Sequence, residues 1–316
     1  MREKIRVGIV GLGFMGGIHL SKLSKIKNAV VSAVFDTDRA KYEGIKDRSI
    51  VRCSDYKELV NLVDAIIISS PSTTHYFYTK YFLNEGVHCL CEKPPVMRMR
   101  ELMSLISIAQ RNGLVYNVVM PERANRVVVD ILSSVAKSGY VFFADRVAPS
   151  YDRSLDTSVL FDIMIHDIDI LKEAIPSKIK RVSANGLSLV GADADLLNVR
   201  IECENGGFAI LNASRMAKDK KRLLRIFYDG GYISADLIKG SYHRIIFEGG
   251  RMVVRKKRVS NTKNDPIMVI DRDFIDSILR GKKSKFSADT LIDVMGICNL
   301  IERRTIFVRK SDLLTY

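Results

Sequence analysis

The chain has 316 residues, which is long for one compact core and favours two domains, each able to bury its own interior. Its formal charge of +14 at pH 7 fits a nucleic-acid binder, a binder of anionic small molecules or a basic proteome, so charge alone selects none of these. No segment approaches about 18 consecutive apolar residues, and the N-terminus runs into a predicted strand rather than a signal peptide, so we expect a cytoplasmic protein without membrane association.

The first 120 residues alternate short apolar runs with segments of helical spacing. Five runs without polar alternation predict strands buried on both faces, at 7–10, 29–34, 65–68, 87–90 and 114–119. Segments 73–85 and 98–112 have helical spacing. Strand, helix and strand in repetition predict a doubly wound parallel sheet, so we expect an α/β domain over residues 1–120.

The second part changes character after Pro121. Three glycine-bearing turns, at 204–207, 229–231 and 248–250, separate runs in which polar and apolar residues mix, which predicts an antiparallel sheet with one packed face. Four helical segments are expected to cover that face, at 123–137, 159–174, 268–280 and 288–304. We expect an α+β domain with a large, mainly antiparallel sheet over residues 121–316, whose other face joins copies of the chain in a homodimer or homotetramer.

The cysteines and the known metal motifs give no sign of a metal site. The five cysteines are scattered and odd in number, without a C-x-x-C pair, at Cys53, Cys89, Cys91, Cys203 and Cys298. This argues against a disulfide framework and against structural zinc. No H-E-x-x-H motif is present either, so we expect no metal.

The first motif that indicates a function lies at the turn after the first predicted strand. Gly11, Gly13 and Gly16 have the G-x-G-x-x-G spacing, directly after a strand and at the start of a helix. Glycine there permits a tight turn and lets a pyrophosphate approach the positive end of the helix. The pattern predicts a dinucleotide-binding Rossmann domain, and the P-loop motif G-x-x-x-x-G-K-[ST] is absent.

The end of the second predicted strand bears on the choice of cofactor. Asp36 lies where a carboxylate accepts hydrogen bonds from the ribose hydroxyls of adenosine, and it would repel a 2′-phosphate. This favours NAD. NADP stays possible, because Arg39 and Lys41 follow closely.

Two further stretches follow predicted strands, at the sheet edge where such sheets bind ligands. The first is SSPSTTH at 69–75, in which His75 is expected to face the cofactor. The second is CEKPP at 91–95, in which Lys93 is placed to exchange or share a proton. The alternative for Lys93 is an ordinary surface lysine.

The segment VLFDIMIHDIDIL at 159–171 combines an apolar helix with charges. At about 100° per residue, Asp162, His166 and Asp169 fall in one narrow stripe. Charges on an apolar helix are costly to desolvate, so either the helix is partly exposed with a local Asp–His pair or the stripe faces a functional cleft.

These motifs occur in register with a known family. The combination of GLGFMG, Asp36, SSPSTTH, CEKP and DIMIHDID resembles the glucose–fructose oxidoreductase / inositol dehydrogenase / MocA (Gfo/Idh/MocA) family of nicotinamide-dependent sugar dehydrogenases, over essentially the whole chain. Within it, MPERAN at 120–125 and the stretch 146–171 look most like the branch that oxidises UDP-N-acetylglucosamine at its 3-hydroxyl.

The resemblance implies a catalytic site made of Lys93, Asp162 and His166. His166 would be the base that accepts the hydroxyl proton, Asp162 would orient the imidazole, and Lys93 would hold the substrate oxygen. Implied cofactor contacts come from Gly11, Gly13, Phe14, Met15, Gly16, Asp36, Ser70, Pro71, His75, Glu92 and Lys93. His166 also belongs to the implied substrate contacts. On their own chemistry, Arg123, Asn125 and Arg153 are expected to bind a phosphorylated or carboxylated substrate, with surface or interdomain salt bridges as the alternative.

The chain also departs from the family pattern. Met164 replaces a glycine between Asp162 and His166, and Ser158 stands in a lead-in that is otherwise glycine-rich. Ala124 replaces an aromatic residue, and Ser214-Arg215 stands where the branch has Asn-Trp. These changes leave the identity of the sugar open.

Three functions compete at this stage. The first is an NAD(P)-dependent dehydrogenase of a sugar, cyclitol or nucleotide sugar, and the second is a dinucleotide-binding sensor or regulator without turnover. The third is a nucleic-acid binder, which explains none of the motifs. The densest basic run, 251–258, has no interleaved aromatic residues and is interpreted as a solvated strand edge, so we expect no nucleic-acid partner.

Overall fold

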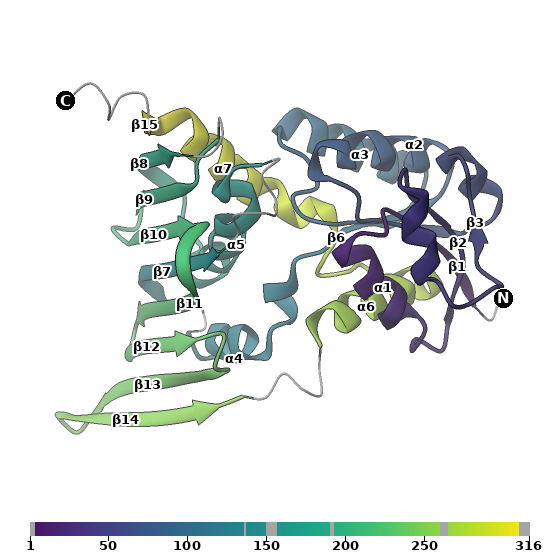
Figure 1. Ribbon diagram of the computed structural model, residues 1–316. Coiled ribbons are helices and arrows are strands. Elements are labelled where there is room, and N and C mark those ends of the chain that lie inside the picture. Colours follow the sequence, from purple (N-terminus) through teal and green to yellow (C-terminus); the bar gives the residue numbers. More distant parts are fainter. Residues whose placement is uncertain (1–3, 136, 150–156, 190–192, 260–264, 310–316) are drawn as a thin grey trace. The chain divides into compact units, whose positions relative to one another are not determined.

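The computed structural model describes residues 4–135, 137–149, 157–189, 193–259 and 265–309 (Figure 1). The chain divides into two compact units. The first comprises Met1–Ala124 and Asn264–Ile292, and the second comprises Asn125–Lys263 and Asp293–Tyr316.

A six-stranded parallel sheet forms the centre of the first unit. Its order is β3-β2-β1-β4-β5-β6, the order of dinucleotide-binding folds. The strands are β1 (Ile5–Val10), β2 (Ala29–Phe35), β3 (Val51–Arg52), β4 (Ala65–Ile68), β5 (His88–Cys91) and β6 (Tyr116–Val118). All four residues of β4 are 0% exposed, because helices cover both faces of the sheet. The predicted doubly wound sheet is confirmed.

The helices of this unit follow the predicted apolar spacing. They are α1 (Phe14–Leu23), α2 (His75–Asn84) and α3 (Met99–Arg111). In α3 the buried residues Leu102, Leu105, Ile106 and Ala109 recur every one to three positions along one stripe, and the helix packs against α2. Short 3₁₀ turns complete the connections, at Arg39–Gly44, Tyr56–Asn61, Ser72–Thr74 and Pro121–Ala124.

The helix expected at 268–280 forms, but it belongs to the first unit and not to the second, where it was expected. It forms as α6 (Pro266–Arg280), but it packs against α1 in the first unit and does not cover the second sheet, so that part of the prediction is wrong. The physical reason is a specific partner surface: α6 buries Ile270, Phe274 and Asp271 there. The stretch after α6 stays in the first unit, where Ser287 forms a β-bridge with Asn117.

A nine-stranded, mainly antiparallel sheet forms the second unit, as expected. Its order is β14-β13-β12-β11-β7-β10-β9-β8-β15, and only the pairs β7–β10 and β8–β15 are parallel among the described residues. The strands are β7 (Gly139–Pro149), β8 (Ile179–Ser188), β9 (Leu196–Cys203), β10 (Phe208–Ser214), β11 (Met216–Tyr228), β12 (Gly231–Asp236), β13 (Ser241–Glu248), β14 (Arg251–Arg258) and β15 (Thr305–Arg309). The three predicted glycine turns join β9 to β10, β11 to β12 and β13 to β14 as hairpins.

Within the described ranges, helices cover one face of this sheet and leave the other without a helix (Figure 1). They are α4 (Arg126–Val135), α5 (Ile165–Ala174) and α7 (Ile292–Arg304). Side chains alternate accordingly: Phe142 and Ala144 of β7 are buried, whereas Phe143 between them is only half-buried and points to the other face.

Candidate active site

The glycine-rich turn joins β1 to α1 and is closely packed at two of its three glycines. Gly11 has φ +88°, and a Cβ there would lie 2.5 Å from the backbone nitrogen of Ser70. A Cβ at Gly16 would collide with the carbonyl oxygen of Gly11. Around Gly13, in contrast, a Cβ would meet nothing within 4 Å. Gly11 and Gly16 are therefore required by the fold. The open space at Gly13, in contrast, is not explained by packing of the chain on itself.

The N-terminus of α1 is suited to an anion. Gly13 is its N-cap residue and provides no side-chain capping bond, and the first turn contains no acidic residue. The side chain of Phe14 is 67% exposed at this end, and that of Met15 is half-buried. The turn thus combines a positive helix end with exposed apolar surface.

Asp36 lies directly after β2 and faces the same turn. Its Oδ2 accepts from the backbone N–H of Leu12 at 2.6 Å, and its Oδ1 accepts from Asp38 N–H at 2.8 Å. Its own backbone N–H donates to the hydroxyl of Tyr42 at 3.0 Å. Each carboxylate oxygen has a second lone pair for a ribose hydroxyl, so the group is fixed in place and still able to accept.

His75 is the first residue of α2, directly after the loop that follows β4, and is 2% exposed. Its Nε2 lies 2.9 Å from the carbonyl oxygen of Ser70, and its Nδ1 lies 2.7 Å from that of Pro94. The ring therefore ties the loop after β4 to the loop after β5. Pro71 precedes the 3₁₀ turn of the same loop.

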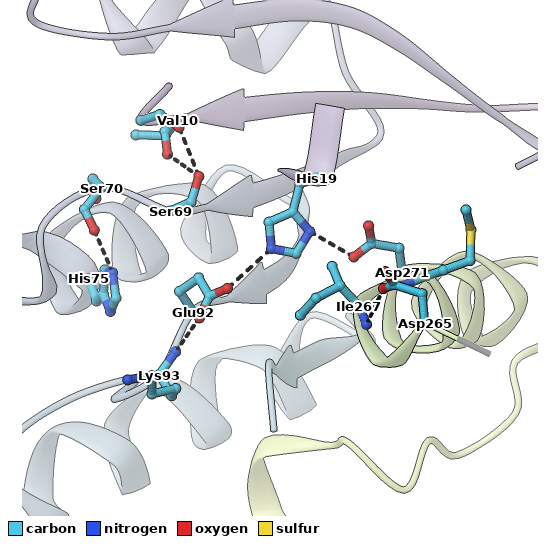
Figure 2. A network of polar contacts seen from close by, with 12 residues as sticks. Val10, His19, Ser69, Ser70, His75, Glu92, Lys93, Asp265, Ile267 and Asp271 are labelled. Atoms are coloured by element: carbon cyan, nitrogen blue, oxygen red, sulfur yellow. Dashed lines mark hydrogen bonds and ion pairs between the residues drawn. The ribbon is translucent and has the colours of Figure 1, made fainter. Parts of the chain in front are cut away.

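Glu92 and Lys93 follow β5 at the same edge of the sheet. Glu92 is 6% exposed, and its Oε2 accepts from the backbone N–H of Lys93 at 3.1 Å. Its Oε1 lies 3.3 Å from Nε2 of His19 in α1 (Figure 2). Lys93 itself is half-buried. The fold thus gathers at one sheet edge the cofactor residues expected in this unit together with Lys93.

Sequence reasoning did not find three of the residues that shape this edge. His19, Asp271 and Tyr42 were not expected there. His19 comes three positions after Gly16, and that spacing was its one signal, whereas Asp271 looks in the sequence like any charge on an amphipathic helix. Tyr42 holds Asp36 and also donates to the carbonyl oxygen of Cys53 at 2.7 Å.

Asp162 and His166 belong to the second unit and lie just before and at the start of α5. A π-helical turn, Leu160–Met164, precedes α5, so the predicted helix begins with a wider turn than expected. Such turns are frequent at functional sites. His166 is 9% exposed and Asp162 is half-buried, four residues apart and so on one face of the helix. Asp162 is the one residue of 159–171 that is not buried, so a partly exposed helix with a local Asp–His pair and a stripe that faces a functional cleft both stay predictions.

The neighbouring charge, Asp167, has a structural partner. Arg146 of β7 donates from Nε to both carboxylate oxygens at 3.0 Å and from Nη2 to Oδ1 at 2.7 Å. Both residues are less than 5% exposed. This bidentate pair fastens α5 to the sheet next to His166.

The expected substrate ligands are distributed between the two units. Arg123, in the first unit, donates from Nη1 to the carbonyl oxygen of Lys285 at 2.7 Å. Asn125, in the second, is buried and accepts from Val127 N–H at 3.0 Å. Arg153 lies outside the described residues.

The positions that depart from the family pattern are mostly buried. Met164 is 0% exposed and Ala124 6%, while Ser158 is half-buried. Arg215 is 3% exposed, and its Nε lies 3.3 Å from Oδ1 of Asp195. This ion pair joins the residue between β10 and β11 to the residue that precedes β9.

The first unit fits a dinucleotide on its own geometry. The open cradle at Gly13, the uncapped positive end of α1 and the fixed Asp36 carboxylate supply a place for a pyrophosphate and for a ribose. Within the described part of the chain, no cluster of three His, Cys, Asp or Glu side chains is arranged to hold a metal ion. No helix there is long and apolar enough to span a membrane.

Comparisons with known proteins agree with this geometry. UDP-N-acetylglucosamine 3-dehydrogenase of Acidithiobacillus ferrooxidans is 30% identical over 282 residues, which cover 87% of this chain and 88% of that protein. Its solved structure, GnnA, superimposes with a TM-score of 0.87 at 26% identity and covers 96% of this chain and 97% of that one.

Two further proteins resemble the chain at lower identity, one in sequence and one in structure. Myo-inositol 2-dehydrogenase of Thermotoga maritima is 23% identical over 254 residues, 74% of this chain and 76% of that protein. GenD2 from gentamicin A biosynthesis, solved in complex with NAD, has a TM-score of 0.83 at 19% identity and covers 96% of this chain and 94% of that one.

Family models match both parts of the chain. The model of an oxidoreductase family with an NAD-binding Rossmann fold matches residues 5–120, and that of the GFO/IDH/MocA C-terminal domain matches residues 131–234. The chain belongs to the Gfo/Idh/MocA family of NAD-binding oxidoreductases.

Proposed function

We propose that the protein is an NAD-dependent dehydrogenase that oxidises a secondary alcohol of a sugar, a cyclitol or a nucleotide sugar. The observation that supports this most directly is the Asp36 carboxylate, held by Leu12 N–H against the glycine turn at the end of the parallel sheet. Bound NAD supplies the hydride acceptor. Proton transfer from the substrate hydroxyl and stabilisation of the substrate oxygen are assigned to side chains of this chain.

Three side chains have the proposed catalytic roles. His166 accepts the proton of the substrate hydroxyl, because imidazole titrates near neutral pH. Asp162 stabilises the imidazolium that results. Lys93 donates a hydrogen bond to the substrate oxygen and offsets negative charge that develops there as the proton leaves.

NAD is the proposed cofactor rather than NADP. Asp36 places a negative charge where a 2′-phosphate would lie. Of the two nearby basic residues, Lys41 lies 3.9 Å from a carboxylate oxygen of Asp38, which weakens its attraction for a phosphate.

A nucleotide sugar similar to UDP-N-acetylglucosamine is the proposed substrate, with support from the Acidithiobacillus ferrooxidans relative. Arg123, Asn125 and Arg153 are the proposed ligands of its polar groups. Arg123 donates from Nη1 to the carbonyl oxygen of Lys285, a contact that fixes the direction of its guanidinium.

The uncovered face of the second sheet is the proposed contact between copies of the chain. Phe143, Phe227 and Tyr232 form a row of ring contacts there, with centroids 6.2 and 4.8 Å apart, and the guanidinium of Arg225 lies 4.9 Å from the Phe143 ring centroid. Replacing Arg225 by glutamate is expected to dissociate the oligomer in sedimentation velocity, whereas Arg255→Glu on the exposed strand β14 leaves it intact. An unchanged sedimentation coefficient for Arg225→Glu contradicts this assignment.

The enzymatic proposal is tested by titration with NAD, followed by a substrate panel of UDP-N-acetylglucosamine, myo-inositol and glucose 6-phosphate monitored at the NADH absorbance. The variants Lys93→Ala and His166→Ala are expected to lose at least about a hundredfold in kcat. Matched controls are Lys22→Ala on α1 and His243→Ala, which is exposed on β13. Parental turnover by both active-site variants rejects the assigned roles, and NAD binding without turnover of any panel member by the parent protein points to a sensor.

A further inference from the structure

Two buried histidines flank the loop that contains Lys93 (Figure 2). His19 is 0% exposed and His75 is 2% exposed. Each ring has a contact at both nitrogens. His19 reaches Glu92, the residue before Lys93, and His75 reaches Pro94, the residue after it.

His19 lies between two carboxylates. Its Nδ1 is 2.8 Å from Oδ1 of Asp271 and its Nε2 is 3.3 Å from Oε1 of Glu92. Only the protonated ring donates to both acceptors. Burial alone would lower the pKa of His19, but the charges and hydrogen bonds of Asp271 and Glu92 outweigh it and raise that pKa to about 10. At neutral pH the ring is an imidazolium.

Glu92 transmits this restraint to Lys93. One carboxylate oxygen faces His19 and the other accepts from the backbone N–H of Lys93 at 3.1 Å. The backbone N–H of Glu92 donates to the carbonyl oxygen of Ile68, at the end of β4, at 2.9 Å. The start of the Lys93 loop is thus fixed through both the backbone and the side chain of Glu92.

We call the contacts that run from Asp271 through His19 and Glu92 to the Lys93 backbone the relay. Its first residue, Asp271, belongs to α6. Asp271 is 0% exposed, and α6 is joined to α1 a second time by Asp265 and Lys22, whose charged atoms lie 2.6 Å apart. This second pair is partly exposed and does not touch Glu92. It provides a natural control, because it joins the same two helices.

Folding stability alone does not require charged groups at this place. Charges taken out of water are costly, and replacing such groups by apolar residues of similar volume is often neutral or stabilising. Here Oδ2 of Asp271 is also buried without a hydrogen-bond partner among the described residues. A cluster retained at that cost suggests a role in positioning.

We propose that His19 and Asp271 are positioning residues for Lys93: together they fix the Glu92 carboxylate, which in turn fixes the backbone at Lys93. This inference rests on the catalytic role proposed for Lys93. His75 restrains the other side of the same loop through the carbonyl oxygen of Pro94 at 2.7 Å. A helix from late in the chain therefore sets the position of a catalytic side chain in the first unit.

The experiment compares the full-length parent with His19→Gln, Asp271→Asn and the control Lys22→Ala. The first readout is competitive acetylation by acetic anhydride, with each lysine quantified by peptide mass spectrometry. Because Lys93 is released from its fixed position, its labelling relative to the other lysines is expected to rise at least about threefold in His19→Gln and Asp271→Asn, and to stay at the parental value in Lys22→Ala. The second readout is NADH binding, which is expected to stay within about twofold, since Asp36 and the glycine turn are untouched.

The third readout is turnover of whichever panel substrate the parent oxidises. Misplacement of Lys93 by about 1 Å is expected to lower kcat by roughly 10- to 100-fold in His19→Gln, per site that binds NADH. A purely structural role would instead reduce the number of NADH-binding sites and leave kcat per site unchanged. Unchanged Lys93 labelling in His19→Gln and Asp271→Asn, or an equal rise in Lys22→Ala, overturns the proposal.

Two further variants keep the outcomes separate. If His19→Gln and Asp271→Asn both prevent folding, Glu92→Gln takes their place, because it changes the carboxylate next to Lys93 and leaves the His19–Asp271 contact in place. Unchanged Lys93 labelling in Glu92→Gln then overturns the proposal, and a rise supports it. If Lys93→Ala retains full turnover, the proposed catalytic function fails, while the labelling of Lys93 still decides whether His19 positions it.

Discussion

The backbone N–H of Leu12 donates to Oδ2 of Asp36 across 2.6 Å, so the carboxylate that follows β2 also holds the glycine turn that follows β1. We expect Asp36→Ala to weaken NADH binding at least about tenfold, because hydrogen bonds to a charged group contribute about 1.5–3 kcal/mol. NADPH binding should be unchanged or tighter. Fluorescence titration of both cofactors measures the effect, with Asp47→Ala, an exposed carboxylate of the same unit, as the control. Unaltered NADH affinity in Asp36→Ala contradicts the assignment.

The three glycines of the turn should respond differently to alanine. Gly13→Ala meets no atom of the chain, so the free energy of unfolding should change by less than about 0.5 kcal/mol while NADH affinity falls at least about tenfold. Gly16→Ala collides with Gly11 and should destabilise the protein by about 1–3 kcal/mol. Urea unfolding and NADH titration of both variants separate the two effects. Normal NADH binding by Gly13→Ala would show that the space at Gly13 is not used by the cofactor.

The imidazolium of His19 predicts a dependence of stability on pH. The pKa of His19 is about 10 in the folded protein against an ordinary value of 6.5, so between these values the folded state keeps a proton that the unfolded state releases. Stability from this group is fully present below pH 6.5 and is lost as pH rises toward 10. We expect the difference in unfolding free energy between the parent and His19→Gln to shrink from pH 7 to pH 9 in urea unfolding. A difference that is constant over this range would mean that the ring is neutral.

The buried pair of Arg146 and Asp167 predicts an effect on stability in the second unit. Arg146→Met leaves the Asp167 carboxylate buried without its guanidinium and should lower the free energy of unfolding by about 3–5 kcal/mol. The double variant with Asp167→Leu should recover part of this loss. Arg255→Met, which breaks an exposed pair with Glu248, is the control and should cost less than about 1 kcal/mol. Equal effects in urea unfolding would show that the buried pair has no special weight.

Much of the first unit could be predicted because its elements have strong local signals. The run Ala65–Ile68 has no polar residue and became a fully buried strand, and the spacing of Gly11, Gly13 and Gly16 determined the turn. The strand Val51–Arg52 was missed because both of its residues are exposed and it has no apolar run. The hairpins of the second unit were found through their glycine turns, whereas β7 and β8 have no such marker.

Residues that act through distant partners could not be predicted. The apolar stripe of α6 shows that this helix packs on something, but periodicity contains no information on which surface it packs against. The partner of Asp271 is 252 residues away in the sequence, and the partner of Asp167, a residue of α5, is Arg146 on strand β7. The π-helical turn before His166 likewise has no distinct spacing that sets it apart from an ordinary helix.

The return of residues 264–292 to the first unit has a consequence for synthesis of the protein. A ribosome delivers the parallel sheet and α1 early, but roughly 140 further residues must be translated before α6 emerges, which takes on the order of 7–30 s. Throughout that interval His19 lacks its contact with Asp271, because Asp271 has not yet been translated. The surface of α1 that α6 later covers is accessible to chaperones during the same interval. Docking of α6 is therefore a late step of biogenesis, and a stalled or truncated translation product would contain the glycine turn without the helix that completes its unit.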